Sequence, residues 1–274
     1  MKGRERILNL LSGGCADRPA RGEIWPLPSG GPAVEVLAAA REIDADFCFF
    51  DQLPGAVPEA RALGLATGAI VNGPWQRWMN LVGWEAAMME LGRGNENVRL
   101  GLAEAAKEAG RDIAAWTTAG VDMILLADDI AFSGGPYMAP AQFEKHLLPL
   151  YAALTEAAEK KGANIGFHSD GCVDLLLPML HTAGFGFYSL EPEATEPMRA
   201  WELLGKSVPL FSGLPAAWLL PGGFTAAGEG SILEGWLSGG PLILTSACGL
   251  FHADALAAVR KIYQWLDKKK YFRH

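Results

Sequence analysis

"NIGFHSDGCVDLLLPML", residues 164–180, contains the repeating unit that decides the fold of this chain. A short apolar run ends abruptly in His168-Ser169-Asp170-Gly171, and a helical pattern follows. A continuous apolar run of this length predicts a strand that is buried on both faces, as in parallel sheets that are covered by helices. The histidine and the carboxylate that end the run either cap the next helix or face a pocket and take part in chemistry.

The rest of the chain repeats this strand-then-helix order. Strands are predicted at 23–27, 46–50, 65–71, 123–127, 164–168, 185–191, 208–213 and 241–246. Helices are predicted at 32–42, 58–64, 74–91, 95–119, 140–161, 172–183, 198–205, 228–238 and 253–269. Eight strands that are nearly continuous apolar runs and alternate with helices predict an α/β fold. Their number favours a closed (β/α)8 TIM barrel over an open doubly wound sheet. The spacing of charged and apolar residues in MKGRERILNLL predicts an N-terminal helical extension.

Length and composition fit one barrel domain over residues 1–274. Apolar residues make up 50% of the chain and charged residues 20%, so a large core can form. The Gly- and Pro-rich stretch 220–230 is interpreted as a loop on the barrel, because no linker long enough to divide the chain is found.

Charge and cysteine content exclude several classes of partner. The net charge of −8 argues against nucleic acid, and the basic cluster at 268–273 is interpreted as a solvated helix end. The longest apolar runs have the length of strands, so no membrane span and no secretory signal are predicted. Four widely spaced cysteines indicate reduced thiols. We therefore expect a cytoplasmic protein, a monomer or a homodimer, that acts on a small molecule.

The predicted strand ends carry a dense set of residues capable of chemistry. In TIM barrels, catalytic residues lie at the carboxyl ends of the strands. The residues at these positions are Glu23, Trp25, Asp51, Gln52, Asn72–Trp75, Asp128, Asp129, His168, Ser169, Asp170, Glu191, Glu193, Ser212, Gly213 and Cys248. A ring of ionisable groups on an otherwise apolar scaffold predicts an enzyme.

Each of these residues also has a structural explanation. Asp170 is a suitable helix N-cap, His168 can be a hydrogen-bonded core residue, and Cys248 can be a buried, inert thiol. The aspartates at 128–129 can open a loop, and the glutamates at 191–193 can lie in a solvated turn. The expectation that all of them surround one barrel mouth favours a site. One imidazole, one thiol and several carboxylates suit zinc, although the chain has no CxxC pair and no HExxH motif.

Four segments of the chain resemble the uroporphyrinogen decarboxylase superfamily, which includes the corrinoid-dependent methyltransferases. RERILNLLSGGCADRPARGEIWP looks like the N-terminal helix and entry of the family, and IVNGPWQRWMNLVGWEAAMMEL is similar to its Gly-Pro segment after the third strand. DDIAFSGGPYMAPAQFEKHLLPLYAALTEAAEKKGANIGFHSDG looks like its most recognisable block, and GPLILTSACGL looks like its last strand. The resemblance implies a (β/α)8 barrel.

The two branches of this family imply different chemistry. The haem-pathway decarboxylases use no metal and bind a polyanionic substrate through an Arg-rich motif. The segment GEIWPLPSGG lacks that motif, and arginine is scarce at the predicted mouth. Methyltransferases of the family bind zinc through a His-x-Cys pair after the fifth strand and a Cys after the eighth.

The resemblance to the methyltransferases implies a zinc site formed by His168, Asp170 and Cys248. Asp170 stands where the family has its first cysteine, and Glu191 or Glu193 can supply another oxygen. Methylcobalamin would be carried by a separate corrinoid protein that docks over the barrel mouth. We expect substrate to be bound by four residues of the strand ends: Trp25, Asn72, Trp75 and Ser212.

Three functional hypotheses follow. The first is a zinc-dependent methyltransferase that moves a methyl group between a corrinoid protein and a small molecule. The second is a metal-free decarboxylase or lyase that acts on a smaller substrate, in which Asp51, Asp128 or His168 acts as acid or base. Glu191 is expected as a further catalytic residue of the site. The third is a non-catalytic barrel that binds a corrinoid protein or a small ligand. Metal content separates the first from the second, and methyl transfer separates the first from the third.

Overall fold

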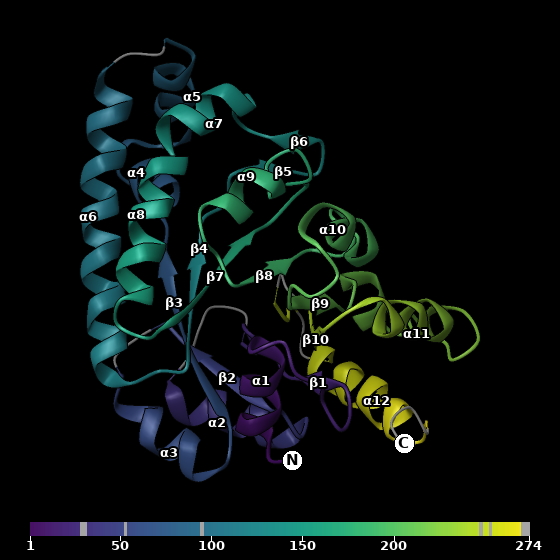
Figure 1. The fold of residues 1–274 in the computed structure, drawn as a ribbon. Helices are drawn as coiled ribbons and strands as arrows, with labels where there is room; N and C mark the ends of the chain where they lie inside the picture. Colours follow the sequence, from purple (N-terminus) through teal and green to yellow (C-terminus); the bar gives the residue numbers. More distant parts are fainter. Residues whose placement is uncertain (28–31, 52–53, 94–95, 247–248, 252–253, 270–274) are drawn as a thin grey trace.

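Within the residues that the computed structural model describes (1–27, 32–51, 54–93, 96–246, 249–251 and 254–269), eight parallel strands form a nearly closed barrel (Figure 1). In spatial order the barrel strands are β1 (Ala20–Arg21), β10 (Leu242–Thr245), β9 (Leu210–Gly213), β8 (Phe187–Leu190), β7 (Asn164–Ser169), β4 (Met123–Ala127), β3 (Ala66–Asn72) and β2 (Phe47–Phe50). The predicted (β/α)8 barrel is confirmed.

Asp46 joins β1 and β2, which are the two ends of this order. Its backbone N–H donates to the Arg21 carbonyl oxygen at 2.7 Å, and its carboxylate accepts the Arg21 N–H at 3.0 Å. The same buried carboxylate forms ion pairs with Arg6 and, at 2.9 Å, with Arg18. The Asp46 side chain therefore supplies part of the contact between β1 and β2, because the two-residue strand β1 is too short to form it with backbone hydrogen bonds alone.

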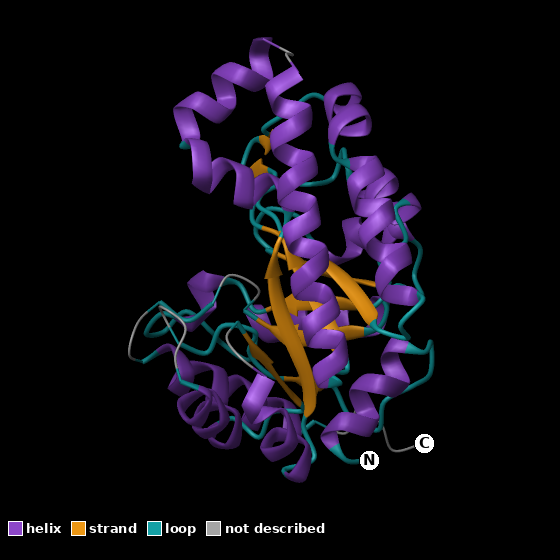
Figure 2. Ribbon diagram, turned by 90° about the vertical axis from the view of Figure 1, so that its left-hand side faces the viewer, coloured by secondary structure: helices purple, strands orange, loops and turns teal. Residues whose placement is uncertain are grey.

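Helices surround the barrel, with the strands at the centre of the molecule (Figure 2). They are α1 (Gly3–Leu11), α2 (Ala33–Glu42), α3 (Val57–Ala62), α4 (Pro74–Val82), α5 (Trp84–Arg93), α6 (Glu96–Ala119), α7 (Pro140–His146), α8 (Leu148–Glu159), α9 (Leu177–Thr182), α10 (Pro197–Leu204), α11 (Glu229–Gly239) and α12 (Ala255–Asp267), with short 3-10 turns η1 (Pro54–Ala56) and η2 (Ala216–Leu219). None of the helices in the described part of the chain combines the length and the apolar character that crossing a bilayer requires.

A small extension rises beyond the carboxyl ends of β3 and β4. It contains α5, α7 and a hairpin of β5 (Ala131–Phe132) and β6 (Gly135–Pro136), which follows β4 directly (Figure 1). The hairpin was not among the predicted elements, because two-residue strands carry no periodic signal.

Alternation along the strands explains why their sequences are apolar throughout. Phe47 and Phe49 belong to the cluster inside the barrel, while Cys48 and Phe50 belong to the cluster between the strands and the helices. The interior contains four phenylalanine rings among aliphatic side chains, and Gly68 faces one of these rings: a Cβ on Gly68 would lie 2.3 Å from Phe49. The predicted N-terminal extension is present as α1, whose Ile7 and Leu10 join the interior cluster.

The structure corrects several predicted boundaries. The strand predicted at 23–27 is wrong, since β1 is Ala20–Arg21 and residues 23–27 form the loop after it. The helix predicted at 74–91 is two helices, because the chain turns at Gly83 with φ of +87°. The helix predicted at 140–161 breaks at Leu147, two residues before a proline that cannot donate a backbone hydrogen bond. The helix predicted at 172–183 begins only at Leu177.

Candidate functional site

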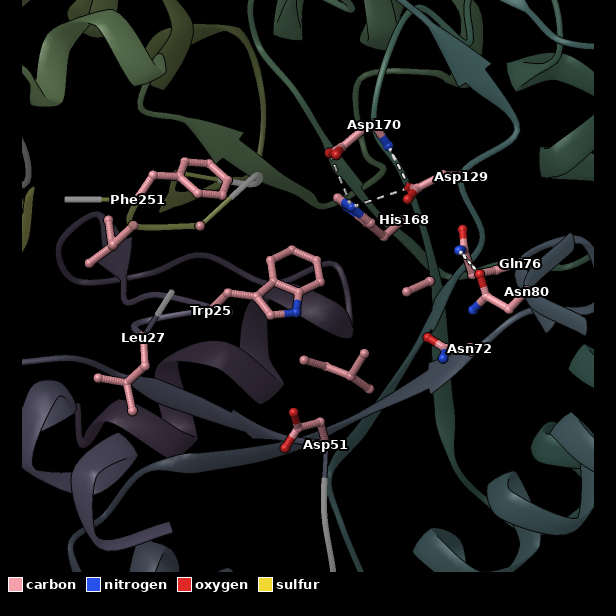
Figure 3. A pocket seen from close by; sticks show the side chains of 14 residues that line it. Trp25, Leu27, Asp51, Asn72, Gln76, Asn80, Asp129, His168, Asp170 and Phe251 are labelled. Atoms are coloured by element: carbon pink, nitrogen blue, oxygen red, sulfur yellow. Dashed lines mark hydrogen bonds and ion pairs between the residues drawn. The ribbon is translucent and has the colours of Figure 1, made fainter. Parts of the chain in front are cut away.

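A pocket of about 400 Å³ lies at the carboxyl ends of the barrel strands (Figure 3). It is lined by Trp25, Leu27, Asp51, Ile70, Asn72, Gln76, Asn80, Ala127, Asp129, His168, Asp170, Gly249, Leu250 and Phe251. These residues come from the ends of β3, β4 and β7, from α4, and from the loops after β1, β2 and β10. The pocket therefore lies at the end of the barrel where the sequence predicted a site.

Asp129, His168 and Asp170 bring one imidazole and two carboxylates together in this pocket. The His168 Nε2 atom lies 3.4 Å from Asp170 Oδ1 and 4.0 Å from Asp129 Oδ1. The histidine side chain is buried, whereas the Asp129 and Asp170 side chains are 42% and 51% exposed. Pairing of Ala127 with His168 in the β4–β7 register places the two strand ends side by side, and the Asp170 N–H donates to Asp129 at 3.1 Å.

The orientation of the His168 ring is fixed by contacts with Ser189 and Trp25. Its Nδ1 lies 3.0 Å from the hydroxyl oxygen of buried Ser189, which pairs with it in the β7–β8 register. The Trp25 ring packs at 4.5 Å between ring centroids. With Nδ1 on Ser189, Nε2 is the nitrogen directed at the two carboxylates. A histidine that ligates a metal is commonly oriented in this way, by a hydrogen bond at its other nitrogen.

The donor set fits a divalent metal ion. Zinc binds nitrogen and oxygen ligands at about 2.0–2.2 Å, so ligand atoms in a tetrahedral site lie roughly 3.4 Å apart. The three ligand atoms of Asp129, His168 and Asp170 all lie within 4.8 Å of one another. The described residues thus contribute one nitrogen and two oxygens, a harder set than a thiolate site would have.

Asp170 lies in the pocket and does not cap a helix. The next helix, α9, begins seven residues later, with Leu176 at its N-cap position. The turn that carries Asp170 is supported by Glu191, which accepts the Gly171 N–H at 3.0 Å. Cys248, the third metal ligand implied by the resemblance, lies outside the described residues.

Asp128 has the contacts of a structural residue. It is fully buried and accepts hydrogen bonds from Trp75 N–H at 3.1 Å, Gln76 N–H at 2.6 Å and the Tyr151 hydroxyl at 2.7 Å. The two amides belong to the first turn of α4, so Asp128 caps this helix from the end of β4. Burial raises the pKa of Asp128 to about 7, while the three donors lower it.

The remaining predicted residues divide into two groups. Trp25, Asp51 and Asn72 line the pocket, as the strand-end rule predicted. Trp75 and Ser212 do not: both are buried, Trp75 packs on Trp78, and the Ser212 hydroxyl donates to the Leu190 carbonyl oxygen at 2.6 Å.

Gln76 and Asn80 are pocket residues that the sequence reasoning missed. They lie four positions apart on α4, and the Gln76 side-chain amide donates to Asn80 at 3.0 Å. The available signal was a pair of amides at i, i+4 on one helix that follows a strand end. Asp129 was recognised as a strand-end residue but was not chosen as a ligand.

Glu23 is a buried carboxyl group that joins two segments of the site region. It is 3% exposed and accepts hydrogen bonds from the Ser246 hydroxyl at 2.6 Å and from Thr245 at 3.3 Å, which ties the loop after β1 to the end of β10. Burial raises the pKa of Glu23 to about 7, against the hydrogen bonds that lower it. Between about pH 4.5 and 7, folded Glu23 keeps a proton that the unfolded chain has lost.

The Glu23 contribution to stability is therefore complete below about pH 4.5 and is lost as the pH rises through about 7. We expect this contribution to be roughly 3 kcal/mol across that range. Urea unfolding of wild type and Glu23→Gln from pH 5 to 8 measures this contribution as the difference between the two free energies of unfolding. Buried Asp128 titrates in both proteins, so its effect cancels in the difference. A constant difference between the two proteins at all pH values would contradict the assignment.

The fold and the pocket together define a TIM-barrel protein with a candidate metal-binding cluster at the carboxyl ends of its strands. No protein-family model matches the sequence, and a search of curated proteins finds no significant match. Among solved structures, a methyltransferase from Methanosarcina mazei is similar over 98% of this chain and 99% of that chain, with a TM-score of 0.79 and 16% sequence identity.

Enzymes with other chemistry share the architecture less closely. An L-ribulose 3-epimerase is similar over 91% of this chain and 93% of its own, with a TM-score of 0.59 and 12% identity. The deoxyribose phosphate aldolase from Aeropyrum pernix is similar over 96% of both chains, with a TM-score of 0.51 and 12% identity. At these identities the likeness shows the fold.

Proposed function

We propose that this protein is a metal-dependent methyltransferase of the uroporphyrinogen decarboxylase superfamily that exchanges a methyl group between a corrinoid protein and a small molecule. The cluster of Asp129, His168 and Asp170 in the pocket is the observation that carries the proposal. The whole-length likeness to a methyltransferase fold and the resemblance of the sequence to that family support it. Zinc is the expected metal, because imidazole and carboxylates are among its usual ligands.

The pocket residues have distinct roles in this proposal. A bound zinc ion supplies a Lewis acid that polarises a heteroatom of the substrate. His168 and Asp170 on the end of β7, with Asp129 after β4, would hold the ion, and Ser189 would fix the tautomer of the His168 ring. Trp25 packs against that ring, with the two ring planes tilted by 58°, and the His168 residue is buried.

The charge of the pocket disfavours the metal-free decarboxylase hypothesis. No lysine or arginine occurs among the described residues that line the pocket, while Asp51, Asp129 and Asp170 do. A carboxylated substrate would therefore meet three carboxylates and no guanidinium or ammonium partner.

Methyl transfer from methylcobalamin tests the proposal. Purified protein with added zinc is mixed with methylcobalamin and a panel of small thiols, and the loss of the methylcobalamin absorption band is followed. We expect a rate above the protein-free rate that requires zinc and is kept by Glu159→Gln, a change on an exposed carboxylate at the end of α8. No acceleration in this direction, and none in the reverse direction from methylated donors to cob(I)alamin, would refute the proposal.

A further inference from the structure

The pocket combines a negative lining with aromatic side chains. Its described lining holds three carboxylates and no lysine or arginine. A lining of this sign attracts cations and repels anions.

A metal ion would leave one of these charges uncompensated. Asp129 and Asp170 together carry two negative charges, which a divalent ion bound with neutral His168 balances. Asp51 remains: its side chain is exposed, and it has no ion-pair or hydrogen-bond partner among the described residues. In the view of Figure 3, Asp51 lies across the pocket from His168, with Trp25 between them.

A backbone contact joins the loops that carry Trp25 and Phe251. The Leu250 N–H donates to the Trp25 carbonyl oxygen at 3.2 Å, which holds the loop after β10 against the loop after β1. Gly249 has φ of +94°, and a Cβ there would lie 3.1 Å from the Trp25 Cβ, so this close approach depends on glycine. Phe251 lines the pocket and is 66% exposed, so its ring is open to a ligand.

The amide groups of the opposite wall add no charge to the pocket. The Gln76 side-chain oxygen is buried and has no hydrogen-bond partner among the described residues. This oxygen is not accessible from the pocket, but the amide side chains of Gln76 and Asn80 make this wall polar and uncharged, so they do not compensate the charge of Asp51.

We infer that Trp25, Asp51 and Phe251 form a subsite for a substituted ammonium group, so that the substrate of this pocket is a small organic cation. Aromatic faces bind such cations through the ring quadrupole, and the free carboxylate of Asp51 balances the charge. The heteroatom at the other end of the substrate then faces His168 and its carboxylates. That this cation is a substrate rests on the proposed methyl transfer. That the cation binds at this subsite does not depend on the proposed function.

Binding of choline and of its neutral isostere 3,3-dimethylbutan-1-ol tests the subsite. The two probes have the same shape and the same hydroxyl group and differ in the charge of the central atom. Calorimetric titration is done on full-length protein, metal-free and zinc-loaded, without corrinoid or turnover. We expect choline to bind at least about tenfold more tightly than the isostere.

Variants assign the effect to the proposed residues. Asp51→Asn and Trp25→Leu are each expected to weaken choline binding about tenfold, while Trp25→Tyr keeps most of it because the ring is retained. Glu159→Gln, which removes one exposed carboxylate at the end of α8, is expected to bind choline as wild type does.

Two results would overturn the inference. One is equal affinity for choline and the isostere, and the other is no binding of choline in either metal state. Since neither result depends on turnover, methyl transfer by a protein that fails this test would leave the proposed function standing. Selective choline binding by a protein without methyl transfer would support the subsite and refute the function.

Discussion

His168→Ala is expected to remove bound zinc and to abolish methyl transfer. The variant deletes the one nitrogen donor of the cluster and leaves Asp129 and Asp170 with no neutral ligand between them. Loss of a residue that only orients a ligand typically costs 10–100-fold in metal affinity, so loss of the ligand itself should cost more than about a hundredfold. Two exposed carboxylates alone would hold zinc weakly.

Elemental analysis of protein that has been purified without chelator measures this effect. Wild type should contain about one zinc per chain and His168→Ala almost none. Ser189→Ala is the graded control: it keeps the donors but frees the His168 ring, so we expect zinc affinity to fall about 10–100-fold. Zinc content that is unchanged in His168→Ala, or absent from wild type after zinc is added, would contradict the metal site.

Cys248→Ala decides between two ligand sets in the same experiment. Loss of zinc would add a thiolate to the described donors and make the metal more electron-rich, as the resemblance implies. Retained zinc would leave a set of one histidine and two aspartates, which binds magnesium, manganese or iron more readily than a thiolate site does. Competition among these metals in wild type gives an independent measure of the same difference.

The barrel could be predicted from the sequence because its strands are buried on both faces. Residues such as Phe47 and Cys48 face opposite clusters and are both apolar, so each strand is a continuous run and the runs can be counted. The first strand was misplaced for the opposite reason. Ala20–Arg21 is too short to show a pattern, and the apolar residues of 23–27 line the pocket and the core instead of a strand.

Only part of the candidate site could be predicted, because strand ends define a region and not its contacts. His168 and Asp170 were found in this way. Ser189 was missed because its contact with His168 depends on the β7–β8 register, which no local pattern encodes. Asp128 and Asp129 follow the last residue of β4, where the alternation of faces ends, so the sequence could not decide which of them turns toward the pocket.

Asp128→Ala is expected to destabilise the fold by about 4 kcal/mol. The variant leaves three buried donors without an acceptor, namely the N–H groups of Trp75 and Gln76 and the hydroxyl of Tyr151. Each unpaired buried donor costs about 1–3 kcal/mol, so three unpaired donors account for a loss of about 4 kcal/mol. Tyr151→Phe removes one of the three hydrogen bonds and should cost about 1–2 kcal/mol.

The adjacent carboxylate provides the matched control for this prediction. Asp129 is 42% exposed and faces the pocket, so Asp129→Ala should change the free energy of unfolding by no more than about 0.5 kcal/mol while it lowers zinc content. Urea unfolding at pH 5, below the raised pKa of Asp128, compares the two variants, because the contribution of Asp128 to stability is lost as the pH rises through about 7. Zinc content is analysed at neutral pH. If Asp128→Ala unfolds at the same urea concentration as Asp129→Ala, the cap on α4 is not what holds this end of the barrel. If Asp128→Ala loses stability and Asp129→Ala loses zinc, the two neighbouring aspartates have different roles. Asp128 then fixes the helix that carries Gln76, and Asp129 binds the metal.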